Sequence, residues 1–170
     1  PGTDSYLSRL AHSYADTLIT PMNDSFIDLD LLADIDMRRH EVMGPSIYTL
    51  MVQEQKAARK ARDGGDIDWI VMRNRLTHLN ATNKKTIGDL LEEVSGLYGF
   101  RTAPGFGERV VFKELFLKGL TLLDLKEDQA GGLSLSQISA RQEVRNLIMA
   151  IAPAKLKGYA QHVKTAKKRA

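Results

Sequence analysis

Basic side chains gather next to the predicted strand ends and helix starts, where they could bind phosphate groups. Lys84 and Lys85 open a predicted helix, and the helix dipole disfavours cations there, so helix stability alone does not explain them. The other members of this basic centre are Arg73, Arg75, Arg101, Arg109 and Lys113. Because the strand ends of a parallel α/β sheet converge on one edge, where ligands bind, the pattern predicts a phosphate-binding surface. An ordinary solvated surface explains the same residues.

Other kinds of catalytic or binding site find less support. The chain has no nucleophile-elbow, Walker A or dinucleotide-binding motif, and its nearest glycine pair, Gly105 and Gly107, lacks the lysine and hydroxyl of a phosphate loop. Asp24 and Asp28 could bring two carboxylates together on one helix face, but a solvated acidic face favoured by the helix dipole is the simpler interpretation. The four histidines, none of them in a metal-ligand spacing, are His12, His40, His78 and His162. We therefore predict no metal site in this chain.

The composition is that of an ordinary soluble domain with unevenly distributed charge. The chain has 170 residues, 43% of them hydrophobic, and no cysteine, which excludes disulfides and thiolate metal sites and suits a reducing cytoplasm. Its apolar runs are far shorter than the roughly 20 residues that a membrane span needs. The net charge of +3 conceals an acidic front (residues 1–41), a basic centre (residues 56–113) and six bases without an acid in residues 155–170. This asymmetry bears on binding partners more than on the fold.

Short apolar strands alternate with amphipathic helices along the chain, which is the pattern of a parallel α/β sheet. We expect helices over residues 4–14, 23–35, 45–62, 84–98, 108–118 and 137–152. We expect extended segments over residues 17–20, 69–72, 100–102 and 120–125. Pro21 should end the first strand and Pro45 should open the third helix. The aromatic residues Trp69, Phe112 and Phe116 fit a core better than a base-stacking platform. About three strands are few for a complete doubly wound domain, so part of a larger sheet is expected.

Several segments of the chain resemble the MipZ division-plane positioning ATPases, which belong to the ParA/MinD group with a deviant Walker A loop. The resembling segments are Thr20–Phe26, Pro45–Tyr48, Asp68–Leu76, Gly99–Arg101, Ala103–Gly105, Glu108–Val111, Gly119–Leu125 and Ala140–Glu143. The resemblance implies an α/β fold, the C-terminal part of a P-loop NTPase-type parallel sheet flanked by helices, with the N-terminal strands and the P-loop absent. Residues 1–153 would form this part of the ATPase domain. Residues 154–170 would be a basic tail, either disordered or a frayed helix.

The resemblance also implies roles for individual residues. Pro1-Gly2 resembles the second half of an aspartate-threonine-proline-glycine motif, so the P-loop, its lysines and the Walker B aspartates would lie upstream, and this segment would hold no catalytic residue. Gly2 would be the switch II glycine whose N–H senses the γ-phosphate. Asn74 would recognise adenine, because a carboxamide donates and accepts hydrogen bonds together. Pro104 would form part of the wall of the base pocket.

The partners implied by the resemblance are those of a nucleotide-gated switch. ATP with Mg²⁺ would drive homodimerisation of the intact protein, which would contact a ParB-like centromere-binding protein, a tubulin-like division protein and nonspecific DNA, in the cytoplasm on the nucleoid. The residues expected to contact DNA phosphates are Lys84, Lys85, Arg101, Arg109 and Lys113. Thr82 and Thr86 stand where arginines occur in relatives, which weakens the DNA prediction. We expect the 170 residues alone neither to bind ATP tightly nor to hydrolyse it. The alternative is a non-enzymatic nucleic-acid-binding or protein-interaction module that uses the basic centre and the tail.

Overall fold

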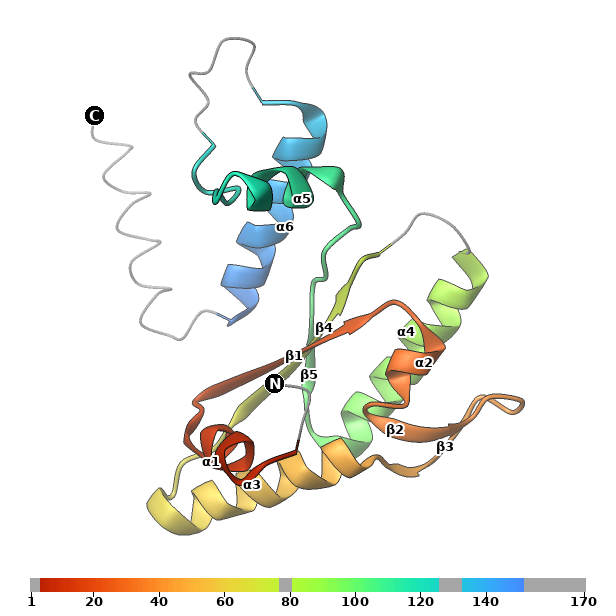
Figure 1. The fold of residues 1–170 in the computed structure, drawn as a ribbon. Helices are drawn as coiled ribbons and strands as arrows, with labels where there is room; N and C mark the ends of the chain where they lie inside the picture. The colour runs from red at the N-terminus through yellow and green to blue at the C-terminus, as the bar shows by residue number, and fades with distance from the viewer. Residues whose placement is uncertain (1–3, 77–80, 126–132, 152–170) are drawn as a thin grey trace, which may run out of the picture. The chain divides into compact units, whose positions relative to one another are not determined.

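The computed structural model describes residues 4–76, 81–125 and 133–151 (Figure 1). The chain divides into two compact units, residues 1–102 and residues 103–170, and each has a hydrophobic core of its own. The predicted boundary between the ATPase portion and the basic tail, at residue 153, lies outside the described residues. None of the helices in the described part of the chain combines the length and the hydropathy that a membrane crossing requires.

A three-stranded sheet in the order β1-β4-β5 is the centre of the first unit. Its strands are β1 (Thr17–Asn23), β4 (Asp68–Asn74) and β5 (Arg101–Ala103). β1 and β4 run parallel, in a register that places Asn23 opposite Asn74. The predicted α/β class, a parallel sheet flanked by helices as in P-loop NTPases, is therefore confirmed. The prediction that Pro21 ends the first strand is wrong: β1 continues past it, and β1 is an end strand of this sheet, where the missing N–H of proline is tolerated.

Most of the helix predicted over residues 23–35 does not form: residues 30–32 are a turn, and residues 33–35 belong to the first strand of a β-hairpin. Only one turn, α2 (Phe26–Leu29), is helical, and the antiparallel strands β2 (Ala33–Asp36) and β3 (Glu41–Pro45) follow it. Every second residue of β2 is buried, which is the periodicity of a strand with one face in the core. The helix prediction is wrong because the apolar and acidic residues of this stretch alternate with period two, which indicates a strand.

Three longer helices complete the first unit. They are α1 (Tyr6–Tyr14), α3 (Ile47–Asp63) and α4 (Ala81–Tyr98). The hydroxyl of Ser46 caps α3 by accepting the N–H of Thr49, so Pro45 lies at the end of β3 and does not open the helix. Gly64 and Gly99 follow α3 and α4 with φ angles of +73° and +69°, a left-handed conformation that favours glycine at helix ends. The predicted end of the fourth helix at residue 98 is confirmed.

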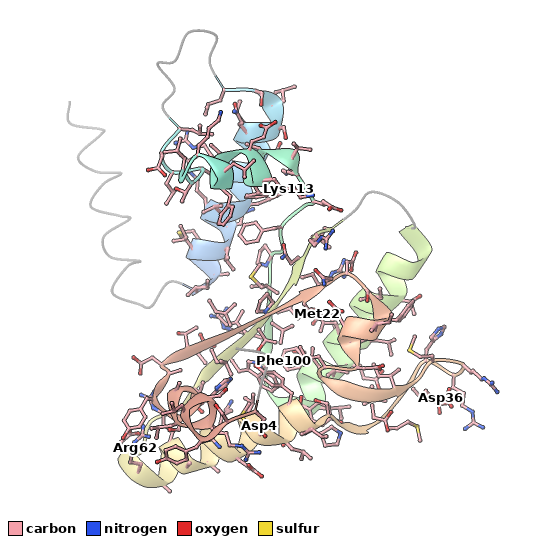
Figure 2. All side chains as sticks on the ribbon, viewed as in Figure 1. Asp4, Met22, Asp36, Arg62, Phe100 and Lys113 are labelled. Carbon is pink, nitrogen blue, oxygen red and sulfur yellow. The ribbon has the colours of Figure 1, made fainter. Side chains whose placement is uncertain are left out.

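Trp69 lies in the core of the first unit, where α3, α4, the hairpin and the sheet meet. Its indole Nε1 donates a hydrogen bond to Thr20 Oγ1 at 3.0 Å, and Thr20 Oγ1 also lies 2.7 Å from the hydroxyl of Tyr48. The indole ring packs 4.9 Å from the ring of Phe100, which Figure 2 labels among the core side chains. The other buried members of this core are Met22, Leu29, Leu32, Ala33, Ile35, Met51, Val52, Val71, Leu90, Leu91 and Val94. The assignment of Trp69 to the core is confirmed.

The second unit consists of two helices around a small core. They are α5 (Val110–Leu117) and α6 (Leu135–Ile151), and the buried residues between them are Val111, Leu115, Leu122 and Ala140. Phe112 packs against this core as predicted, but Phe116 is 82% exposed, contrary to prediction. The segment 120–125 is a turn rather than an extended run, because the carboxylate of Asp124 accepts both the backbone N–H and the hydroxyl of Thr121 at 2.7 Å.

Candidate functional site

The carboxyl ends of β1 and β4 place two asparagines next to each other. Asn23 and Asn74 are the last residues of their strands and are partners in the parallel register. Asn74 is half-buried, and Asn23 is exposed. Ligands of open parallel sheets bind outside this edge. Asn74, the residue predicted to recognise adenine, thus lies at the edge where a ligand is expected, and its role stays a prediction.

The carboxamide of Asn74 is held in place by the backbone that follows it. Its Oδ1 accepts the backbone N–H of Arg75 at 2.9 Å. Arg75 has a φ of +54°, a left-handed conformation that is uncommon for a residue other than glycine, so the chain turns sharply just after β4. A carboxamide oxygen can accept a second hydrogen bond and the NH₂ group has two donors, so this arrangement is compatible with a ligand hydrogen bond to each.

An ion pair joins the residue that follows Asn23 to the residue that precedes Asn74. Asp24 Oδ1 and Arg73 Nε are 3.0 Å apart, and the two side chains are only 9% and 17% exposed. The sequence placed Asp24 on a solvated acidic face and Arg73 on either a phosphate-binding or a solvated surface, whereas the structure pairs the two side chains with each other. This pair could not be found from the sequence, because the register that aligns Asn23 with Asn74 must be known first.

Arg101 lies at the opposite edge of the sheet. It is the first residue of β5, and its guanidinium forms a two-pronged ion pair with Asp68, the first residue of β4 (Nε–Oδ1 2.8 Å, Nη2–Oδ2 2.7 Å). Hydrogen bonding from Arg101 lowers the pKa of Asp68, and the same bond raises the pKa of Arg101. The structure therefore does not bring Arg101 together with Arg73, at the carboxyl end of β4, as the convergence argument predicts.

The two basic candidates in the second unit also have acidic neighbours. Arg109 Nη2 donates to Glu143 Oε1 at 2.7 Å, and this hydrogen bond raises the pKa of Arg109. Glu143 accepts the N–H of Gly107 as well, at 3.2 Å, so a carboxylate of the chain itself occupies the glycine turn that superficially resembles a phosphate loop. Lys113, which Figure 2 labels, is 74% exposed. Its Nζ lies 3.8 Å from Glu108 Oε1.

The remaining predicted residues are placed as follows. Lys85 is exposed on α4, and Lys84 belongs to the same helix, with its side chain outside the described part of the structure. Pro104 is exposed just after β5, at the start of the second unit. Gly2 lies outside the described residues. Within residues 4–76, 81–125 and 133–151, no group of three or more histidine or acidic side chains could hold a metal ion.

The comparison with protein families agrees with this architecture. Residues 1–154 match the family model described as ATPase MipZ, whereas a search among curated proteins found no match. The matched range includes the whole sheet, the asparagine pair and both helices of the second unit. A match over that much of the chain, on a parallel α/β sheet of the expected class, is sufficient to assign the family: the chain belongs to the MipZ ATPases.

Proposed function

We propose that this chain contributes the adenine-binding side of an ATP-dependent dimerisation switch that positions the bacterial division plane. Membership of the MipZ family makes it a division-related ATPase of the ParA/MinD type. The observation that carries the finer proposal is the position of Asn74, a carboxamide at the carboxyl end of β4 whose orientation is fixed by the Arg75 N–H.

The proposed role of Asn74 follows from the chemistry of adenine. The edge of adenine that carries N6 and N7 presents one donor and one acceptor side by side, and a carboxamide matches both with two hydrogen bonds. The family also suggests that Pro104, after β5, contacts the base and that Gly2 senses the γ-phosphate. ATP is the proposed ligand with Mg²⁺, and we assign no Mg²⁺ ligand to the described residues.

The proposed partners follow from the family rather than from a surface of this chain. ATP binding would favour a homodimer, and the dimer would contact a ParB-like centromere-binding protein, a tubulin-like division protein and nonspecific DNA. Arg101 and Arg109 each form an ion pair of 2.7 Å with a carboxylate of the chain. Lys113 lies 3.8 Å from Glu108 and Lys85 is exposed on α4, which favours the two lysines among the proposed DNA contacts that the structure describes. Lys84 belongs to the same proposed set.

The experiment that tests this function replaces Asn74 by alanine in the intact protein. Asn74→Ala should weaken ATP binding by about 1–3 kcal/mol, because the adenine edge loses both its partners. Isothermal titration calorimetry with a non-hydrolysable ATP analogue measures this change, and sedimentation should show dimerisation shifted to higher analogue concentration. Asn146→Ala, which removes an exposed carboxamide of α6, is the control and should bind ATP like the wild type. An unchanged affinity in Asn74→Ala would refute the assignment.

A further inference from the structure

We propose that the buried Asp24–Arg73 ion pair is a positioning device that sets the adenine specificity of this site. The inference rests on the function proposed for Asn74 and names the two residues that hold it in register. Neither residue is assigned a contact with the nucleotide: both act through Asn74.

The ion pair lies next to the two asparagines at the strand ends. Asp24 directly follows Asn23, and Arg73 directly precedes Asn74, so the ion pair crosses diagonally between the two strand ends that carry the carboxamides. The pair ties the end of β4 to the residue that follows β1, so its loss leaves the end of β4, including Asn74, less restrained. The carboxamide of Asn74 depends on the backbone at this point, because its Oδ1 accepts the N–H of Arg75 in the same turn.

The two charges of the pair are largely removed from solvent. Asp24 Oδ1 is buried and accepts no hydrogen bond from the described residues, so the charge of Arg73, 3.0 Å away, is its compensation. A buried ion pair of this kind adds little net stability, because desolvation costs about as much as the attraction returns, and apolar residues of similar volume are often as stable. What the pair does supply is a fixed geometry, since an unpaired partner in a buried position is strongly unfavourable.

Helix α4 leaves little space around the guanidinium of Arg73. A Cβ atom added to Gly88 of α4 would lie 3.3 Å from Arg73 Nη1, which is tighter than ordinary van der Waals contact. The backbone of α4 therefore borders the arginine on one side while Asp24 borders it on another. An arginine confined in this way holds the end of β4 with little freedom.

The consequence for specificity follows from the difference between purine bases. Adenine presents a donor at N6, whereas guanine presents an acceptor at O6, and N7 accepts in both. A carboxamide in fixed orientation favours adenine, because its oxygen meets the donor and its NH₂ group meets N7. A carboxamide released from that orientation loses the preference, while contacts to the triphosphate are unaffected. Loosening the ion pair should thus reduce the preference for ATP over GTP.

The test measures the dissociation constants of ATP and GTP for the intact protein and for variants of the pair. Arg73→Met should weaken ATP binding about tenfold and leave GTP binding within about twofold, so the ATP/GTP preference falls. Arg73→Lys keeps the charge and should retain most of the preference. Because the methionine variant leaves Asp24 unpaired and could unfold, the double variant Asp24→Asn/Arg73→Gln, which removes both charges, provides a second measurement and should show the same loss of preference.

The matched control is Asp68→Asn, which breaks the ion pair at the other end of the same strand. It should lower the thermal midpoint without changing the ATP/GTP preference. If the Arg73 variants fold and lose affinity for both nucleotides equally, or keep the wild-type preference, the positioning role is overturned, while a loss of preference in Asn74→Ala still upholds the adenine assignment. If Asn74→Ala itself keeps the preference, the adenine assignment fails and this inference fails with it.

Discussion

Two kinds of basic residue, equivalent in the sequence, have different surroundings in the structure. Arg73, Arg101 and Arg109 each lie within 3.0 Å of a carboxylate oxygen, whereas Lys113 Nζ is 3.8 Å from Glu108 and Lys85 is exposed on α4. An arginine can bind a carboxylate through two parallel N–H groups, which a lysine cannot do. The arginines of this chain are therefore part of its internal structure first, and a phosphate ligand would have to compete with Asp24, Asp68 or Glu143 for them.

The Asp68–Arg101 pair predicts a pH dependence of stability. Hydrogen bonding to Arg101 lowers the pKa of Asp68 below its ordinary value, so the folded state binds this proton less readily than the unfolded state. The stabilisation is fully present above the unfolded pKa and is lost as the pH falls below about 4 through the lower folded pKa. Urea unfolding between neutral and acidic pH should show a smaller acid-induced loss in Asp68→Asn than in the wild type. Equal losses would contradict this contribution.

In the candidate site, Asn74 was predictable from the sequence, whereas the ion pair beside it was not. Asn74 could be singled out because it follows an apolar strand in a motif that resembles MipZ. Asp24 and Arg73 could not be paired, because they are 49 residues apart and meet only through the parallel register of β1 with β4. Two charged residues that pair between neighbouring strands are distant in the sequence, so no local sequence pattern indicates that they form an ion pair.

The secondary-structure elements were predictable where a helix carries its own end signals. α3 and α4 end at glycines with left-handed φ angles, and both ends were predicted within a residue or two. The β2–β3 hairpin was missed because the period-two alternation covers only the four residues of β2, so the longer apolar series from Phe26 to Ile35 was interpreted as one helix. The turn at residues 120–125 was mistaken for a strand because its leucines suggest burial, whereas its side-chain hydrogen bonds decide the conformation.

Two glycines near the end of α4 should respond to alanine in opposite directions. Gly96 is exposed inside the helix, so Gly96→Ala should raise the free energy of unfolding by up to about 1 kcal/mol through the higher helix propensity of alanine. Gly99 has a φ of +69°, so Gly99→Ala should lower the free energy of unfolding by about 1–2 kcal/mol through backbone strain.

Chemical denaturation of the two variants measures both effects. A Cβ atom at either position would meet no atom within 4 Å, so packing changes do not confuse the comparison. Changes of the same sign in the two variants would show that the left-handed turn does not determine where α4 ends.

For the whole molecule, the proposed DNA contacts predict a difference in salt dependence. In the ATP-bound intact protein, Lys85→Ala should reduce the slope of log affinity for duplex DNA against log salt by about 1, as expected for one lost phosphate contact. Arg101→Met should change the slope less, because this guanidinium is already paired with Asp68. Fluorescence anisotropy over a salt series measures both slopes. A larger change for the arginine variant would reverse the assignment.

The division into two units gives Trp69 a use as a spectroscopic probe. It is the single tryptophan of the 170 residues, it is 1% exposed, and it lies entirely within the first unit. Its fluorescence therefore reports the unfolding of the sheet and the helices of the first unit, whereas far-ultraviolet circular dichroism records the helices of both units. Overlaying the two melting curves measures whether the units unfold as one cooperative system, without the need to introduce a label.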